Sequence, residues 1–231
     1  MKRLVPLLLL ACLSLPAFPA DGPEAGIRKV LEDRLKAKVD KIAKSPMPGV
    51  YEVVADGQII YTDEKAAYFI HGDMRDTQTM RNLTAEKRFA MLPLDLAVKT
   101  VRGNGKNVIV TFEEPNCGYC KKLAKELVKV KDATVYTFLY AVLGEDSVAK
   151  SKIILCSADR SKAWNDWMLN GKAPGNPKDG CDAAPILNKT MAVGQSLGIH
   201  GTPFLMFANG QQAPGYIGAD EIFNRLSDAG T

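Results

Sequence analysis

Hydrophobic positions in the first third of the chain change from a helical spacing to a strand spacing. In residues 24–36, apolar side chains recur every three or four positions between charges, which predicts a short amphipathic helix. Residues 50–55 and 58–62 are rich in strand-forming side chains, and the Asp-Gly pair at 56–57 is typical of a hairpin turn. A further run at 67–71 completes an antiparallel meander. A unit this small buries little apolar surface, so we expect a second copy of the chain to stabilise it.

The following segment is predicted to be a helical linker, residues 83–105. Residues 84–99 have a helical pattern, with Thr84 as the expected N-cap. Pro93 must kink or interrupt this helix, because proline has no backbone N–H to donate. A glycine-rich turn at 103–106 then marks a domain boundary. Earlier in the chain, Val39 and Ile42 fit either a longer first helix or the start of a strand.

From residue 106 onward, strand and helix patterns alternate. The apolar run 107–112 is suited to a strand buried on both faces, and a helix at 118–131 and a strand at 134–143 complete a βαβ unit. The remaining predictions are helices at 147–170 and 182–197, a hairpin at 204–217 and a helix at 220–227. The expected fold class is an α+β N-terminal domain, a helical linker, and an α/β domain with a helical insertion.

The first twenty residues have the features of a secretory signal peptide. Lys2 and Arg3 precede an apolar run that is shorter than the roughly 20 residues needed to span a bilayer, and small residues follow it. We expect cleavage after Ala20. The alternative is a lipid-attachment box that makes Cys12 the new N-terminus. Both interpretations predict export.

Composition and charge narrow the class of protein. The apolar fraction of 46% and the charged fraction of 24% exclude a fibrous or wholly disordered chain. Removing residues 1–20 takes away two of 30 basic residues and none of 26 acidic ones, which leaves a net charge of +2. This weak, evenly spread charge argues against a nucleic-acid partner. Four cysteines remain after processing, and in an oxidising compartment they suggest disulfides, with three pairings open.

The candidate chemistry is concentrated in Cys117-Gly118-Tyr119-Cys120, where a predicted strand ends and a helix starts. Free backbone N–H groups and the positive end of the helix dipole would face the Cys117 sulfur, and Lys121 adds positive charge. All of these favour the thiolate that disulfide exchange requires. We therefore predict that Cys117 is the attacking group and that Cys120, about one turn later, is the resolving group. Lys122 adds charge in the same way.

Half of a zinc site is the alternative interpretation of this motif. Zinc needs four ligands, yet the sequence has no second C-x-x-C, and His71 and His200 show no paired ligand spacing. A strand followed by C-x-x-C and a helix is instead typical of a thioredoxin-like redox site. We expect no metal and no cofactor.

Gly201-Thr202-Pro203 opens the late hairpin, where proline suits the first position of a strand. A cis bond before Pro203 would place the Thr202 backbone beside the sulfurs. The sequence alone does not favour this, because only about 5–6% of such bonds in folded proteins are cis.

A strand, a C-x-x-C, a helix and a later Thr-Pro before a hairpin resemble the thioredoxin fold. The whole chain resembles the DsbC-type family of periplasmic disulfide isomerases. The shared features are Asn116-Cys117-Gly118-Tyr119-Cys120, Gly201-Thr202-Pro203, Asn209-Gly210, Pro214-Gly215-Tyr216 and Ile70-His71-Gly72-Asp73-Met74. The resemblance covers nearly all of the chain after residue 20.

The resemblance implies roles for particular residues. Cys117 would be the nucleophile, Cys120 its partner, and Thr202-Pro203 a cis-proline loop that binds substrate together with Gly118 and Tyr119. Cys156 and Cys181 would form a buried structural disulfide, with a second redox pair as the alternative.

The resemblance also implies an arrangement of domains and partners. Residues 21–82 would be a dimerisation domain and residues 106–231 a thioredoxin-like catalytic domain. Misfolded exported proteins would be the substrates in the periplasm. A membrane reductase of the DsbD type would supply electrons.

Some positions depart from the thioredoxin pattern. Thr111 stands six residues before the first active cysteine, where thioredoxin carries a buried acid. Glu113 and Glu114 lie closer to the motif, and we expect both to be solvated loop carboxylates. Trp164 and Trp167 are predicted to be helix core, and His200 is predicted to be a surface residue.

These observations favour a disulfide isomerase with associated chaperone activity. A DsbG-like periplasmic thiol reductase uses the same chemistry and is the nearest alternative. A holdase chaperone without redox turnover and an oxidase are the others.

Overall fold

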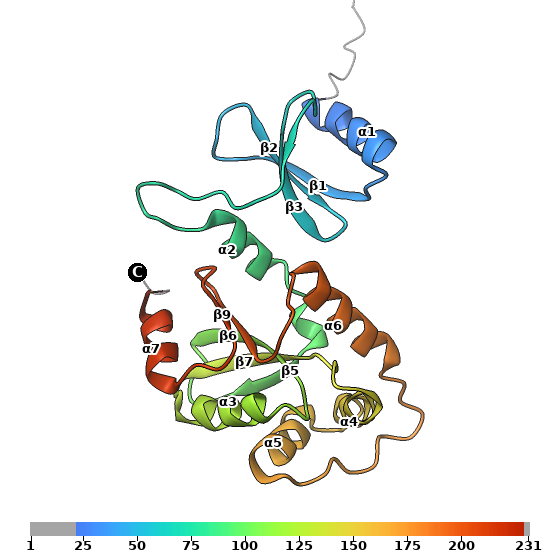
Figure 1. Ribbon diagram of the computed structural model, residues 1–231, viewed down its shortest axis with the longest axis vertical. Helices are drawn as coiled ribbons and strands as arrows, with labels where there is room; N and C mark the ends of the chain where they lie inside the picture. The colour runs from blue at the N-terminus through green and yellow to red at the C-terminus, as the bar shows by residue number, and fades with distance from the viewer. Residues whose placement is uncertain (1–21, 229–231) are drawn as a thin grey trace, which may run out of the picture.

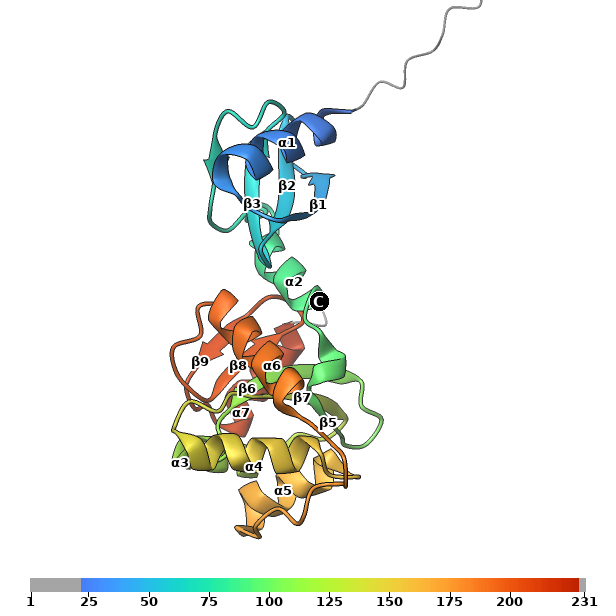
Figure 2. The ribbon, with the colours of Figure 1, turned by 90° about the vertical axis from the view of Figure 1, so that its right-hand side faces the viewer.

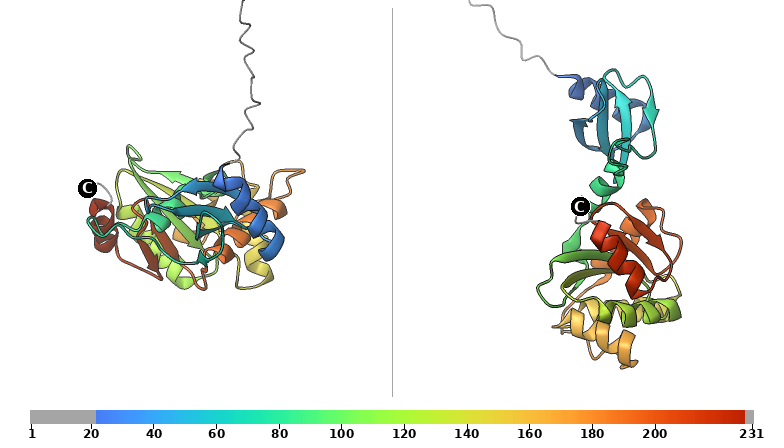
Figure 3. Two further views of the ribbon diagram at one scale, coloured as in Figure 1. Left: turned by 90° about the horizontal axis from the view of Figure 1, so that it is seen from above. Right: turned by 90° about the vertical axis from the view of Figure 1, so that its left-hand side faces the viewer.

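The computed structural model describes residues 22–228, which form two bodies connected by one helix (Figure 1). Helix α2 (Leu83–Ala90) runs between the N-terminal body and the C-terminal body, and the view from the side shows the same separation (Figure 2). The right-hand panel of Figure 3 shows it again from the opposite side. Within the described range, no helix has both the length and the apolar character that a membrane crossing requires.

The N-terminal body is an antiparallel sheet of four strands with one helix packed on it. Ile27 and Leu31 of the helix are buried against Tyr51 and Val53 of the sheet. The predicted hairpin turn is present, and Asp56 and Gly57 both have the positive φ that such a turn needs. The elements in order are α1 Pro23–Leu35, β1 Val39–Lys44, β2 Val50–Ala55, β3 Gln58–Asp63 and β4 Phe69–Ile70.

The linker is helical over a shorter length than predicted. Helix α2 ends at Ala90, a 3-10 turn follows Pro93, and strand β5 (Val98–Val101) then joins the sheet of the C-terminal body. The prediction of helix as far as residue 99 is therefore wrong. Proline ends the helix, and the β-branched residues after it have a neighbouring strand to pair with.

The N-cap of α2 also differs from the prediction. Asn82 caps the helix by accepting a hydrogen bond from Ala85 N at 3.0 Å. Thr84 is buried instead, and its hydroxyl bonds Tyr61 OH at 2.6 Å and Met74 N at 2.7 Å. These contacts fix the start of α2 against the N-terminal sheet.

The sheet of the C-terminal body has the strand order β5-β7-β6-β8-β9. Strand β6 runs parallel to β7, and helix α3 connects them, which confirms the predicted βαβ unit. Strand β8 is antiparallel to β6 and starts where β6 ends. The end of β6 therefore lies between the end of β7 and the start of β8. The bounds are β6 Asn107–Glu113, α3 Gly118–Lys129, β7 Ala133–Leu139, β8 Phe204–Phe207 and β9 Gln212–Pro214.

Helices cover both faces of this sheet. Helices α3 and α7 pack on one face around Ile109 and Phe207. Helix α6 and the end of the linker pack on the other face around Phe112 and Phe138. The predicted helical segment 147–170 is two helices, α4 and α5, which pack beside α3 as an insertion. The bounds are α4 Glu145–Leu155, α5 Arg160–Asn170, α6 Ala184–Ser196 and α7 Ala219–Asp228.

Candidate active site

The Cys-Gly-Tyr-Cys motif lies at the end of β6, and Cys117 is the N-cap residue of α3. The Cys117 sulfur accepts a hydrogen bond from the backbone N–H of Cys120 at 3.4 Å. This N–H belongs to the first turn, where a helix has no partners of its own for its amides. The structure thus places the Cys117 sulfur at the positive end of a helix, as the sequence predicted.

The two sulfurs differ in their exposure to solvent. Cys117 is partly exposed, whereas Cys120 is fully buried, and neither is in a disulfide. The Cys120 sulfur accepts a hydrogen bond from Glu114 N at 3.5 Å. Burial raises the pKa of the Cys120 thiol, and the nearby charge of Glu113 raises that pKa further. Cys120 is therefore held as a protonated thiol, out of reach of solvent.

Thr202 and Pro203 lie directly beside the motif, although they follow it by more than eighty residues. The peptide bond between them is cis. In its thiol form, Cys117 Sγ donates to the Thr202 carbonyl oxygen at 3.6 Å. Gly118 and Tyr119 are exposed on the first turn of α3, next to the same sulfur. All six predicted active-site positions are therefore at one edge of the sheet.

Glu113 is buried, so the prediction of a solvated loop carboxylate is wrong for this residue. It is the last residue of β6 and only 1% exposed. One carboxylate oxygen accepts from Thr111 Oγ1 at 2.7 Å, and the other has no hydrogen-bond partner in the described part of the chain. Burial raises the pKa of Glu113 from 4.5 to about 7, against the hydrogen bond from Thr111 and the smaller effect of the Arg102 charge. The apolar strand 107–112 continues without a turn residue into Glu113, and this was the available signal.

Glu114 is also buried, at 0% exposure, and it is the most extensively bonded side chain at the site. One oxygen accepts from Asn116 N at 2.8 Å and from the hydroxyl of Ser147 in α4. The other oxygen accepts from Val142 N at 2.8 Å and from Leu143 N at 3.3 Å. Glu114 thereby connects the loop before Cys117 to the loop after β7. The prediction of a solvated carboxylate is wrong here too.

Two lysines next to the motif pack over aromatic rings. Lys121 Nζ lies 4.3 Å from the centre of the Trp167 ring, and Lys122 Nζ lies 4.9 Å from that of Tyr119. Trp167 also donates its indole N–H to Pro115 O at 2.6 Å. Trp164 is helix core, as predicted, but Trp167 additionally supports the loop that leads to Cys117.

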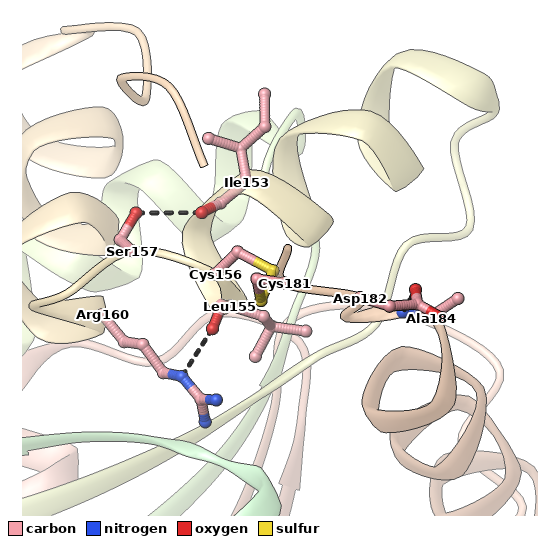
Figure 4. Close-up of a disulfide and its surroundings, with 8 residues drawn as sticks. All are labelled: Ile153, Leu155, Cys156, Ser157, Arg160, Cys181, Asp182 and Ala184. Carbon is pink, nitrogen blue, oxygen red and sulfur yellow. Dashed lines mark hydrogen bonds between the residues drawn. A yellow bond between two sulfur atoms is a disulfide. The ribbon is translucent and has the colours of Figure 1, made fainter. Parts of the chain in front are cut away.

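Cys156 and Cys181 form a disulfide with a Cα–Cα distance of 5.8 Å (Figure 4). The bridge fastens the end of α4 to the loop that precedes α6, and Lys178 N donates to Cys156 O at 3.1 Å in the same loop. Cys156 is buried, but Cys181 is exposed. The expectation of a buried bridge is therefore correct for only one of the two residues.

The described residues contain no group of three or more His, Cys, Asp or Glu side chains that could hold a metal ion. His71 lines a cavity of about 250 Å³ between the β2–β3 turn and the end of α6, far along the chain from the motif. His200 is exposed, as predicted. The signal peptide and Cys12 lie outside the described residues.

Family models match two parts of the chain. Residues 94–230 match a thioredoxin-like domain, and residues 18–85 match the N-terminal domain of disulfide bond isomerase proteins. These two regions correspond closely to the C-terminal and N-terminal bodies of the structure.

Individual relatives cover most of the chain. It is 40% identical over 195 residues to the probable thiol:disulfide interchange protein DsbC of Bordetella pertussis, covering 81% of this chain and 68% of the relative. It is 30% identical over 230 residues to the thiol:disulfide interchange protein DsbC of Salmonella typhimurium, covering 96% of this chain and 93% of the relative. A crystal structure of a disulfide interchange protein from Neisseria gonorrhoeae matches with a TM-score of 0.55 and 36% identity, over 60% of this chain and 98% of the other.

Proposed function

Because the chain belongs to the DsbC-type family of thiol:disulfide interchange proteins, we propose that it reshuffles incorrect disulfides in exported proteins. Cys117 is the nucleophile and Cys120 its resolving partner. The observation that supports this assignment most strongly is the unequal exposure of the two sulfurs at the start of α3. A reactive sulfur must reach a protein substrate, and only Cys117 is accessible.

The proposed cycle leaves the enzyme unchanged. The Cys117 thiolate attacks one sulfur of a substrate disulfide, forms a mixed disulfide and releases the other substrate sulfur as a thiolate. That thiolate attacks a second disulfide within the substrate. A substrate thiolate finally attacks the mixed disulfide, forms the new substrate disulfide and releases the Cys117 thiolate. No net electrons enter or leave the pair.

Cys120 acts only when the substrate fails to rearrange. It must lose its proton, attack Cys117 Sγ and displace the substrate sulfur, which leaves an oxidised Cys117–Cys120 pair. Burial keeps Cys120 protonated, so its attack on the mixed disulfide is slow and the substrate has time to rearrange. The oxidised pair then needs two electrons, for which we propose a membrane reductase of the DsbD type.

The residues beside the sulfurs would position the substrate. The Thr202 carbonyl oxygen, 3.6 Å from Cys117 Sγ, belongs to backbone with which an extended substrate could pair. Pro203 keeps this segment at the start of β8, and the exposed Gly118 and Tyr119 border the sulfur from the side of α3.

We propose a homodimer formed through residues 21–82. Edge strand β4 and the residue before it present large apolar side chains to solvent, with Ile70 65% exposed. An exposed apolar edge is suited to pairing with a second copy. Two copies would enclose an apolar space between facing active sites, which accounts for the proposed chaperone activity. The predicted signal peptide, residues 1–20, supports the proposal that the protein acts in the periplasm.

Refolding of scrambled ribonuclease tests the proposed activity. The wild-type protein should restore ribonuclease activity, and the Cys117→Ala variant should not. A DsbG-like reductase of single thiols would fail to rescue scrambled ribonuclease in its wild-type form. If the wild-type protein and a Cys117→Ala/Cys120→Ala variant prevented aggregation equally and neither rescued ribonuclease, the protein would be a holdase.

The redox state of the pair in the cell separates an isomerase from an oxidase. Cell extracts quenched with acid and alkylated under denaturing conditions should show two modified thiols per chain, since the isomerase cycle requires a reduced pair. Modification of none would indicate an oxidase. A Cys156→Ser/Cys181→Ser variant serves as a control, because it should show the same two modified thiols.

A further inference from the structure

The loop after β7 carries two apolar side chains that the proposed cycle does not use. Val142 is 47% exposed and Leu143 is 60% exposed. Val142 borders a shallow groove of about 620 Å³ that lies between this loop and α4, with Ala141, Val148 and Ala149 also in its lining. Leu143 follows Val142 directly and is exposed beside it. Large apolar side chains that stay exposed together are typical of a contact surface for another molecule.

This loop and the cis-proline loop lie on opposite sides of the nucleophile. Strand β6 leads to Cys117 and has β7 as one neighbour and β8 as the other. Because β7 is parallel to β6, its chain leaves the sheet at the same edge and enters residues 140–143. Because β8 is antiparallel, it enters the sheet at that edge, immediately after Pro203. A substrate chain that lies across Cys117 would therefore reach both loops.

Glu114 links the apolar loop directly to the segment that carries Cys117. Its two carboxylate oxygens accept from Asn116 N on one side and from Val142 N and Leu143 N on the other. Both amides of the apolar loop are thus held by one buried side chain. The Val142 and Leu143 side chains therefore project from a backbone whose position relative to Cys117 is fixed.

We propose that Val142 and Leu143 form a contact surface for apolar side chains of the substrate polypeptide next to its disulfide, and that Glu114 is the positioning residue of this surface. The proposal rests on the proposed isomerase function. The occupant is an unfolded segment of polypeptide, since misfolded proteins expose apolar side chains and the surface adjoins the sulfur that attacks them. A small disulfide such as oxidised glutathione has no apolar side chains and therefore gains no affinity from this surface.

A Val142→Ser/Leu143→Ser variant tests the surface. We expect KM for scrambled ribonuclease to rise about tenfold with kcat unchanged, because two partly exposed apolar side chains lose their contact with substrate. Exchange of Cys117 with oxidised glutathione should stay at the wild-type rate. Val128→Ser, at the far end of α3 and 49% exposed, is the matched control and should change neither value.

Two results would overturn the proposal. One is an unchanged KM in the variant. The other is an equal loss of activity toward ribonuclease and glutathione, because the loop would then act on the thiol and not on the polypeptide. Failure of the wild-type protein to exchange with glutathione at all would instead contradict the proposed function. The single change Val142→Ser, at a residue that lines the groove, keeps the test available if the double variant folds poorly.

Glu114→Gln tests the positioning role, because an amide group can accept at only one of the two oxygens. We expect the same rise in KM, and little additional rise when Glu114→Gln is combined with Val142→Ser/Leu143→Ser. Full additivity of the two effects would contradict a shared mechanism. Asp220→Asn removes one charge from the exposed start of α7, outside this groove, and is the control for charge alone.

Discussion

Ionisation of buried Glu113 should make the catalytic domain less stable as the pH rises. The pKa of this carboxyl is raised from 4.5 to about 7 in the folded protein, so its ionised form costs about 3 kcal/mol more in the folded state than in the unfolded chain. Well below pH 4.5 the group is protonated in both states and costs nothing. Above that value the unfolded chain releases its proton first, and stability falls until the pH passes about 7.

Glu113→Gln removes this penalty while keeping an acceptor for Thr111. Most of the penalty, about 2–3 kcal/mol, develops between pH 5 and pH 8. The variant should therefore gain about that much stability relative to the parent protein over the same interval. Both proteins should carry Cys117→Ala, so that the active-site disulfide cannot form.

Urea denaturation followed by tryptophan fluorescence is a suitable assay. The chain has two tryptophans, Trp164 and Trp167, and both belong to α5 in the C-terminal body, so the signal reports on that domain. Glu145→Gln, which alters an exposed carboxylate, should keep the parent's pH dependence. If the free energies of unfolding of Glu113→Gln and of the parent changed with pH in parallel, to within about 0.5 kcal/mol, the raised pKa of Glu113 would be wrong.

Three further predictions concern the disulfide, the dimer and the loop before Cys117. Replacing Cys156 and Cys181 by serine should lower the free energy of unfolding by about 3 kcal/mol, since the bridge spans 25 residues. An unchanged urea midpoint would show that the disulfide does not constrain the unfolded chain. Ile70→Lys should yield monomers in sedimentation experiments, because it puts a charge on the apolar edge of β4, and a dimer that persisted would place the interface elsewhere. Trp167→Phe should cost about 1 kcal/mol by removing the hydrogen bond to Pro115, and ribonuclease rescue should slow with it; full activity would show that the bond does not support the active-site loop.

Local patterns were sufficient to place the reactive motif. The apolar run 107–112, the C-x-x-C and the following amphipathic segment predicted a strand, a turn and a helix start, and Cys117 caps that helix in the structure. The Asp-Gly turn at 56–57 was equally clear, because few other residues tolerate two successive positive φ angles. The pairing of Cys156 with Cys181, and the cis bond, were expected from the resemblance alone.

Contacts between distant segments explain what the sequence analysis missed. Glu113 and Glu114 have the sequence pattern of loop residues, and they are buried because α3, α4 and the loop after β7 pack against them. Nothing near Trp167 in the sequence indicates its contact with Pro115, which lies 52 positions away. Residues 98–101 carry β-branched side chains, but a run of four is too short to predict a strand by itself, and it becomes β5 because an edge of β7 is available for pairing.

Competitive alkylation of the reduced protein most directly tests the central claim that only one of the two sulfurs reaches substrate. A short pulse of iodoacetamide, followed by denaturation, labelling with a second reagent and peptide mapping, assigns the order of reaction. We expect the first reagent on Cys117 and the second on Cys120, which is fully buried. Equal labelling of both cysteines by the first reagent, or prior labelling of Cys120, would contradict the account.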